Sequence, residues 1–275
     1  MTNSDELRAI AQRITTAQDD AVQIEPSTTR SADFDVDTAY AVAHLIHDSR
    51  TAAGAVPVGR KIGFTNASMW PVYDVHEPIW GYVYDSTVVR MQSAAEGATC
   101  RIGRYSEPKI EPEIILHFGA TPAANADVPG ILSCVDWIAH GFEIVQSAYP
   151  GWKFKIADTI ANSAMHATLL VGPPQPVAQL GPDLIDKLER FSLALLRNGV
   201  VEDTGVGANV LGSPLAAVQH LLRVLARQPQ YPPLSRGEMV TTGTLTAAMS
   251  VHPGENWSTR LEGVALPGIS VDFVA

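Results

Sequence analysis

The chain of 275 residues is 46% hydrophobic and 17% charged, and its 29 acidic residues against 19 basic ones give a net charge of −10. This composition is typical of soluble globular proteins and offers no basic stripe to nucleic acid or to an anionic membrane. The two cysteines are too few for a disulfide framework, the start MTNSDELR lacks a signal-peptide core and no apolar run could span a bilayer, so we expect a cytoplasmic protein that binds small molecules.

Residues 1–55 are predicted to form a small helical portion. Ser4 can cap a first helix, whose apolar residues recur at helical spacing from Leu7 to Ile14. After a polar connector, Asp37 can cap a second helix that ends near Gly54.

From residue 56 onward, short extended runs interrupted by glycine predict mostly β structure. We therefore expect an α+β fold, with the helical portion at 1–55 and a larger, mostly β domain at 56–275. The first extended runs lie at 59–66, 77–89, 111–119 and 140–145, and further runs follow residue 237.

Two local signals lie in the C-terminal half. Asn198-Gly199 between apolar runs predicts a β-hairpin, because both turn positions need positive φ, although residues 188–196 could also be helical. Ser213 followed by Pro214 predicts the start of an amphipathic helix that ends near Gln228.

Glu111-Pro112-Glu113 is the most informative stretch of the sequence. Proline disfavours a helix interior, so the segment should be extended, and residues two apart in an extended chain share a face. Two carboxylates on one face with apolar neighbours would repel each other unless a cation lay between them. Half of a metal site is one interpretation. An edge strand with two solvated glutamates is the other.

Glu143 lies in a second strand-like run, without a lysine or arginine near it in sequence. Together with Glu111 and Glu113 it supplies three hard oxygen donors, which suit Mg²⁺ or Mn²⁺ better than zinc. His44 and His47 lie three apart on a predicted helix, but no third ligand is evident near them, and surface histidines are the simpler interpretation.

Lys61 lies between two glycines, where the backbone can approach a ligand closely, although a lone lysine in a strand usually keeps its charge in water. Further on, Lys153, Lys155, Asp158 and Thr159 form a cluster that is either an ordinary polar loop or part of a site. Asp158 could equally cap a helix that starts at Thr159.

A family resemblance rests on several segments in a fixed order. They are GRKIGFTN (59–66), VHEPIWGYVYD (75–85), IEPEI (110–114), FEIVQS (142–147), WKFKIADT (152–159), RNGVVEDTGVGANVLGSPLAAV (197–218) and TTGTLTAAMSVHPGE (241–255). Over roughly residues 37–273 the chain resembles the 2-keto-4-pentenoate hydratase / 4-oxalocrotonate decarboxylase group of the fumarylacetoacetate hydrolase superfamily.

The resemblance implies a mixed β-roll, a homo-oligomer and a divalent cation, Mg²⁺ or Mn²⁺, bound by Glu111, Glu113 and Glu143. The spacing Lys-x-x-x-Thr in the family selects Lys155 rather than Lys153. The implied catalytic residues are Lys61, Lys155 and Asp158, and the implied substrate-binding residues are Thr159, Thr242, Gly243 and Thr244.

The substrate expected from this resemblance is a 2-oxo acid, which chelates the cation while a lysine adds positive charge where the enolate oxyanion develops. The expected reaction is addition of water to a 2-hydroxy-2,4-dienoate in aromatic catabolism. The same enolate chemistry would serve decarboxylation of a 2-oxo-3-enedioate or hydrolysis of an acylpyruvate.

Two departures from the family pattern bear on these alternatives. Ile79 stands where relatives often have an acidic residue, and Gln146 stands where many have an aspartate, so a possible acid/base carboxylate is absent. A hydrolase would use a His–Glu pair, for which His76 and Glu77 are candidates. Loss of the acid/base group also allows a non-catalytic metal-binding protein.

Overall fold

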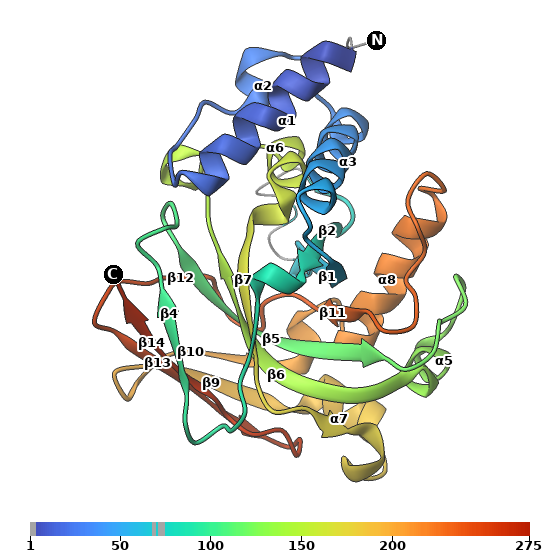
Figure 1. The fold of residues 1–275 in the computed structure, drawn as a ribbon. Coiled ribbons are helices and arrows are strands. Elements are labelled where there is room, and N and C mark those ends of the chain that lie inside the picture. Colours follow the sequence, from blue (N-terminus) through green and yellow to red (C-terminus); the bar gives the residue numbers. More distant parts are fainter. Residues whose placement is uncertain (1–3, 68–69, 71–74) are drawn as a thin grey trace.

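The computed structural model describes residues 4–67, 70 and 75–275. Four helices gather at one end of the molecule, above the strands (Figure 1). They are α1 (Ser4–Asp19), α2 (Ser27–Arg30), α3 (Val36–Ala52) and α6 (Ile156–Ala161). Because α6 comes from the middle of the chain and packs against α3, the domain boundary expected at residue 55 stays a prediction.

Both helices predicted at the N-terminus are present, but neither predicted cap is: Ser4 lies within α1 itself, and the cap of α3 is a different residue from the one predicted. Asp35, and not Asp37, caps α3, because the Asp35 carboxylate accepts a hydrogen bond from the backbone N–H of Thr38 at 2.8 Å, and the helix itself begins at Val36. The connector predicted between the helices contains the short helix α2.

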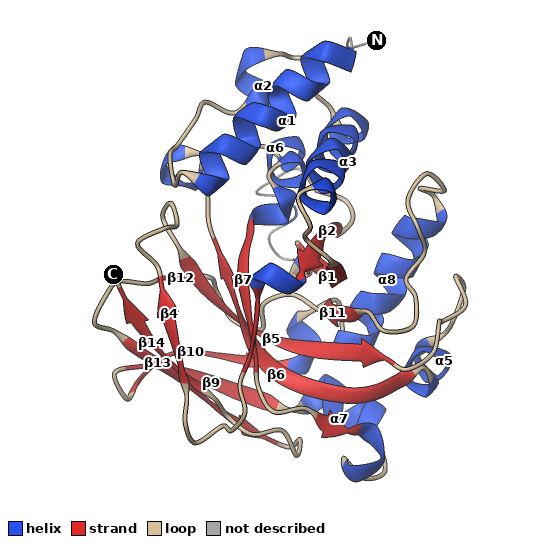
Figure 2. Ribbon diagram, in the orientation of Figure 1, coloured by secondary structure: helices blue, strands red, loops and turns tan. Residues whose placement is uncertain are grey.

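The strands form two mixed sheets below these helices (Figure 2). The order in the larger sheet is β2-β1-β11-β5-β6-β7-β3, with β12 beside β5 and β8 beside β6, and the order in the smaller sheet is β10-β9-β13-β14-β4. The larger sheet contains β1 (Pro57–Gly63), β2 (Ile79–Tyr84), β3 (Val88–Arg90), β5 (Lys109–Phe118), β6 (Val135–Val145), β7 (His166–Val171), β8 (Gln175–Pro176), β11 (Met239–Thr241) and β12 (Met249–Ser250). The smaller contains β4 (Ala98–Arg101), β9 (Ser192–Arg197), β10 (Val200–Val206), β13 (Asn256–Glu262) and β14 (Ser270–Val274). The predicted α+β class is thus confirmed.

Both local signals of the C-terminal half are confirmed. Asn198 and Gly199 adopt φ of 50° and 80° between β9 and β10, and Ser213 caps α8 by accepting from the N–H of Ala216. The remaining helices are α5 (Val128–Ser133), α7 (Leu184–Arg190), α8 (Pro214–Ala226) and the 3-10 turns η2 (Asp85–Thr87), η3 (Pro150–Trp152), η4 (Ser163–Met165), η5 (Val177–Gln179) and η6 (Gly207–Asn209). None of the helices among the described residues is long and apolar enough to cross a membrane.

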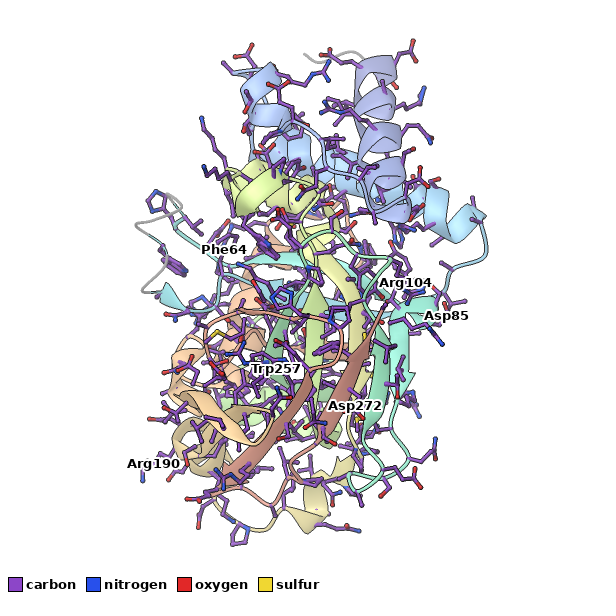
Figure 3. All side chains as sticks on the ribbon, turned by 90° about the vertical axis from the view of Figure 1, so that its left-hand side faces the viewer. Phe64, Asp85, Arg104, Arg190, Trp257 and Asp272 are labelled. Carbon is purple, nitrogen blue, oxygen red and sulfur yellow. The ribbon has the colours of Figure 1, made fainter. Side chains whose placement is uncertain are left out.

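The apolar core joins the sheets to α8. Ile114 of β5, Leu195 of β9 and Leu221 of α8 belong to one buried cluster, and Trp257 of β13 lies in the interior of the strand-rich part (Figure 3). This packing holds β5 and β6 in place, and these two strands carry Glu111, Glu113 and Glu143.

A buried histidine crosses from one sheet to the other. The His140 ring on β6 lies 2.9 Å from the Glu113 carbonyl oxygen and 2.9 Å from the Thr259 hydroxyl on β13. Burial lowers the pKa of His140 to about 4, so the ring is neutral at pH 7. Because a carbonyl oxygen only accepts, Nδ1 donates to Glu113 and Nε2 accepts from Thr259.

Candidate metal centre

Three glutamates meet on one face of the larger sheet. β5 and β6 run antiparallel with Glu111 opposite Glu143, and Glu113 follows two residues along on the same face as Glu111. One carboxylate oxygen from each residue lies within 4.8 Å of the other two. The proline in Glu-Pro-Glu is accommodated within β5, which confirms the extended conformation predicted for it.

The surroundings of these carboxylates fit a divalent cation. Glu113 and Glu143 are fully buried, while Glu111 reaches the cleft. Glu113 Oε2 accepts from the Gly243 N–H at 2.8 Å, but Glu113 Oε1 has no hydrogen-bond partner among the described residues, and Glu143 Oε2 makes no hydrogen bond there either, although the Lys61 ammonium lies 3.3 Å from it. Buried carboxylate oxygens without partners are costly, and a cation between the three groups would satisfy them.

The pKa values of the cluster reflect this crowding. Burial, assisted by the Glu143 charge, raises the pKa of Glu111 to about 7. Burial and the charges of Glu143 and Glu111 raise the pKa of Glu113 well above its usual range. Burial would also raise the pKa of Glu143, but Lys61 and His166 outweigh it and hold that pKa below its usual value. The metal-free cluster therefore carries charge unevenly, with Glu143 the most firmly ionised member.

Lys61 is a buried part of this centre, and not a surface lysine. Its ammonium on β1 donates to the Ala164 carbonyl at 2.8 Å and forms an ion pair with Glu143 Oε2 at 3.3 Å. Burial lowers the pKa of Lys61, but the attraction of the three carboxylates is larger, so the pKa is raised and the amine stays charged.

A cleft of about 390 Å³ opens over the centre, with Lys61 and Glu111 in its lining. Its other walls are largely apolar. Lys109 is one of the charged lining residues, and its Nζ stands 4.2 Å from the centre of the Trp152 ring. Phe64, one of the wall residues, lies just below the helical end of the molecule (Figure 3). The apolar wall residues larger than alanine are Ile62, Phe64, Ile79, Val145, Trp152, Phe154 and Met165.

The chain is similar to characterised enzymes along nearly its whole length, although no protein-family model matches it. A 2-keto-4-pentenoate hydratase from Paraburkholderia xenovorans (strain LB400) is 31% identical over 257 residues, which are 92% of this chain and 90% of that protein. A 4-oxalocrotonate decarboxylase from Pseudomonas putida is 28% identical and covers 99% of this chain and 98% of its own. The chain belongs to the 2-keto-4-pentenoate hydratase / 4-oxalocrotonate decarboxylase group.

Solved structures agree with this membership. The 4-oxalocrotonate decarboxylase from Pseudomonas putida G7, complexed with magnesium and adipate, matches with a TM-score of 0.90 at 26% identity, covering 100% of this chain and 99% of that one. A fumarylpyruvate hydrolase from Pseudomonas aeruginosa in complex with Mn²⁺ and pyruvate matches 78% of this chain and 88% of its own, with a TM-score of 0.60 at 17% identity, and shares the fold. The predicted β-roll of the fumarylacetoacetate hydrolase superfamily is therefore confirmed.

In this member of the group, part of the predicted substrate-binding set reaches the cleft. Thr159, Gly243 and Thr244 line it. Gly243 adopts φ of 96°, which lets its N–H point at Glu113. Thr242 is fully buried, and its hydroxyl donates to the Ile114 carbonyl at 3.0 Å. Thr242 therefore anchors the turn that Gly243 and Thr244 form.

Two residues predicted as catalytic lie elsewhere. Lys155 is exposed at the N-cap of α6, outside the cleft lining. Asp158 is fully buried and accepts from the N–H and hydroxyl of Thr28, at 3.0 and 2.6 Å, and from the N–H of Lys155 at 3.0 Å. α6 begins at Ile156, so Asp158 stands inside its first turn. The catalytic roles of Lys155 and Asp158 stay predictions.

The structure adds residues that the sequence did not single out. Lys109 precedes Glu111 by two positions, and strand alternation alone could have placed it on the same face. His166 bonds to Glu143 across β6 and β7, and no local pattern signals that contact. His47, considered above as a possible metal ligand with His44, instead stacks on Tyr82 and lies 3.1 Å from the Tyr84 hydroxyl. In the described part of the chain, the three glutamates are the only group of side chains placed to bind a metal ion together.

Proposed function

We propose that this protein is a Mg²⁺- or Mn²⁺-dependent hydro-lyase that adds water to a 2-hydroxy-2,4-dienoate formed during aromatic catabolism. The observation that carries this proposal is the buried three-glutamate cluster with Lys61 beside it, open to a cleft of about 390 Å³. Membership of the hydratase and decarboxylase group supports it. A cytoplasmic location and a homo-oligomeric state are proposed with it, the latter to be measured by light scattering.

Glu111, Glu113 and Glu143 would hold the cation. When bound, the divalent ion acts as a Lewis acid for a chelating 2-oxo acid and stabilises negative charge on its enolate form. The glutamates also fix where the substrate's oxygens must lie, because Glu113 and Glu143 close the buried side and Glu111 borders the cleft.

Lys61 supplies the positive charge that the chain itself brings to the reacting oxygens. The Ala164 carbonyl and Glu143 fix its ammonium, so little reorganisation is needed as an oxyanion develops. Lys61 Nζ also carries a proton that it can share with that oxyanion. Ile79 lines the cleft where relatives often have an acidic residue, so this wall excludes water and offers no carboxylate.

Gly243 and Thr244 border the cleft at the turn predicted to hold the substrate carboxylate. The aromatic residues Phe64, Trp152 and Phe154 line the same cleft and shield the diene from bulk water. This arrangement orients a planar conjugated acid with its carboxylate at the turn of Gly243 and Thr244 and its 2-oxygen toward Lys61.

Loss of dienoate absorbance tests the proposal. Protein stripped with EDTA should be inactive, and adding Mg²⁺ back should restore turnover. Lys61→Met should lower kcat strongly while leaving the protein folded. Activity that survives complete metal removal would contradict the proposal.

A decarboxylase of 2-oxo-3-enedioates is the second candidate, and Lys109 is the observation that favours it. Lys109 lines the cleft with its ammonium over the Trp152 ring, where it could meet a second carboxylate on the substrate. Lys109→Met should then raise KM for an enedioate, measured by carbon dioxide release, and leave KM for an uncharged-tail dienoate unchanged. Equal effects on both substrates would remove the reason for this candidate.

The hydrolase alternative has less support. His76 and Glu77 are exposed and lie outside the cleft lining, and Glu77 pairs with Arg227 beyond the end of α8. His76→Ala should leave activity unchanged, and a strong loss of acylpyruvate hydrolysis would restore the alternative.

A further inference from the structure

A buried imidazole lies directly behind one of the three glutamates. His166 Nδ1 stands 2.8 Å from Glu143 Oε1, and His166 Nε2 stands 2.8 Å from the Thr87 hydroxyl. His166 is 7% exposed and Glu143 is fully buried. Since an ionised carboxylate only accepts, Nδ1 carries the N–H of this pair, and both ring nitrogens have a partner.

The backbone of β7 is irregular at the place where His166 enters the sheet. Glu143 pairs with Leu169 and Ile144 with Thr168, but a register shift then pairs Val145 with His166. In regular pairing Ala167 would stand opposite Val145. The bulge instead places His166 on the face that carries Glu143, which is how bulges re-aim side chains near active sites.

The turn before His166 is strained. Ser163, Ala164 and Met165 adopt φ of 54°, 50° and 66° in succession, a left-handed conformation that residues with a Cβ rarely adopt. This turn delivers the Ala164 carbonyl to Lys61 and His166 to Glu143. Two local departures from regular structure therefore end on contacts with the metal centre, which is where such strain accumulates in proteins.

The contact determines how Glu143 can turn. With Oε1 tied to the imidazole, Oε2 is the oxygen that faces Lys61 and the cluster, and Oε2 has no hydrogen-bond partner in the described structure. Thr87 holds the far side of the ring and is itself fixed, because its carbonyl accepts from the Thr168 hydroxyl at 2.8 Å. Glu143 thus rests on a chain of fixed groups, Thr168, Thr87 and His166.

We propose that His166 is a positioning residue of the metal centre: its Nδ1–H holds Glu143 Oε1 so that Oε2 points at the cation. His166 touches neither the cation nor the substrate and acts through Glu143. The inference rests on the proposed function only in that Glu143 binds the metal.

Metal binding to the stripped protein, measured by calorimetry with Mn²⁺ and Mg²⁺, tests this role without any turnover. Two variants form a matched pair. His166→Asn keeps an N–H near the Nδ1 position, and His166→Leu has a similar shape without it, while both lose the contact with Thr87. His166→Leu should weaken metal affinity about 10–100-fold. His166→Asn should retain most of the wild-type affinity.

The midpoint of thermal unfolding of each metal-free variant separates a positioning role from a packing role. If His166 only packed, both variants would unfold at a lower temperature, and their metal affinities would not differ from each other. Should the Leu variant not fold, His166→Met takes its place, since its unbranched side chain can extend into the adjoining cavity of about 240 Å³. Affinities in the Asn and Leu (or Met) variants that are equal, whether unchanged or equally weak, overturn the inference. A wild-type protein that binds neither ion removes the proposed function as well, which distinguishes the two failures.

Discussion

At Glu113, metal binding and folding stability should oppose each other. Glu113→Gln keeps an acceptor for the Gly243 N–H and replaces a carboxyl whose pKa is raised well above its usual range by burial and by the charges of Glu143 and Glu111. Without metal the variant should be more stable than the wild type at pH 8, on the order of 1 kcal/mol, because a carboxyl whose pKa is raised in the fold costs stability above its unfolded pKa. With Mg²⁺ the order should reverse, since saturation at 100 times Kd stabilises the wild type by about 2.7 kcal/mol.

Thermal unfolding at pH 8, once in EDTA and once in Mg²⁺, measures both halves of this prediction. A variant that is less stable than the wild type in EDTA would show that Glu113 is held by contacts stronger than the repulsion around it.

The meeting of the three glutamates could be predicted from the sequence. The proline between Glu111 and Glu113 favours an extended segment with both acids on one face, and Glu143 is a further acid within an apolar run. Lys61 needed the family resemblance as well. The surroundings of Asp158 could not be predicted, since they depend on Thr28, which is 130 positions away in the chain. His166 was missed for the same kind of reason, because a register shift sets its direction.

At the scale of elements, the turn at Gly243 should be intolerant of a side chain. A Cβ on Gly243 would overlap the Thr65 side chain, and φ of 96° is strained for any residue with a Cβ. Gly243→Ala should displace the turn, remove the N–H from Glu113 and weaken Mn²⁺ affinity.

Gly254→Ala is the matched control, because Gly254 has φ of 89° and open space around the added Cβ. Gly254→Ala should lose about 1–2 kcal/mol of stability, because a residue with a Cβ is strained at positive φ, and it should bind Mn²⁺ normally. If both alanine variants bind the metal equally well, the turn does not support Glu113.

α6 and α2 are joined through Asp158, which accepts three hydrogen bonds in a buried position. Asp158→Asn replaces one acceptor oxygen by a donor, so stability should fall by about 1–3 kcal/mol. If the role of Asp158 is to hold these helices, kcat at a temperature where the variant is folded should change little. A loss of kcat with unchanged stability would instead support the catalytic role predicted from the sequence.

At the scale of the whole molecule, composition and glycine spacing were sufficient to predict that helices come first in the chain and that mostly strands follow. They were not sufficient for the pairing of the strands. β1 lies beside β11, whose residues come 180 positions later in the chain, as the pair Gly59 and Met239 shows. Such parallel pairing leaves no mark on local periodicity, so the β-roll could be predicted only from the family resemblance.

His140, whose ring joins the two sheets, should make the free energy of unfolding depend on pH. His140 is neutral in the fold, with a pKa lowered by burial to about 4 against 6.5 for the free side chain. Between these values the unfolded chain binds more protons than the folded one, so stability rises with pH and is lost as the pH falls from 6.5 toward 4. Between pH 7 and pH 5 this group should remove about 2 kcal/mol.

Other groups titrate in the same range, so the informative quantity is a difference. His140→Asn keeps a donor for the Glu113 carbonyl and cannot take up a proton, and it should be less stable than the wild type at pH 7 because it loses the contact with Thr259. Urea unfolding in EDTA at both pH values should show that the gap between the two proteins narrows by about 2 kcal/mol at pH 5. A gap that stays constant would mean that His140 gains no proton on unfolding, and the sheets would then be joined by an imidazole that is already charged.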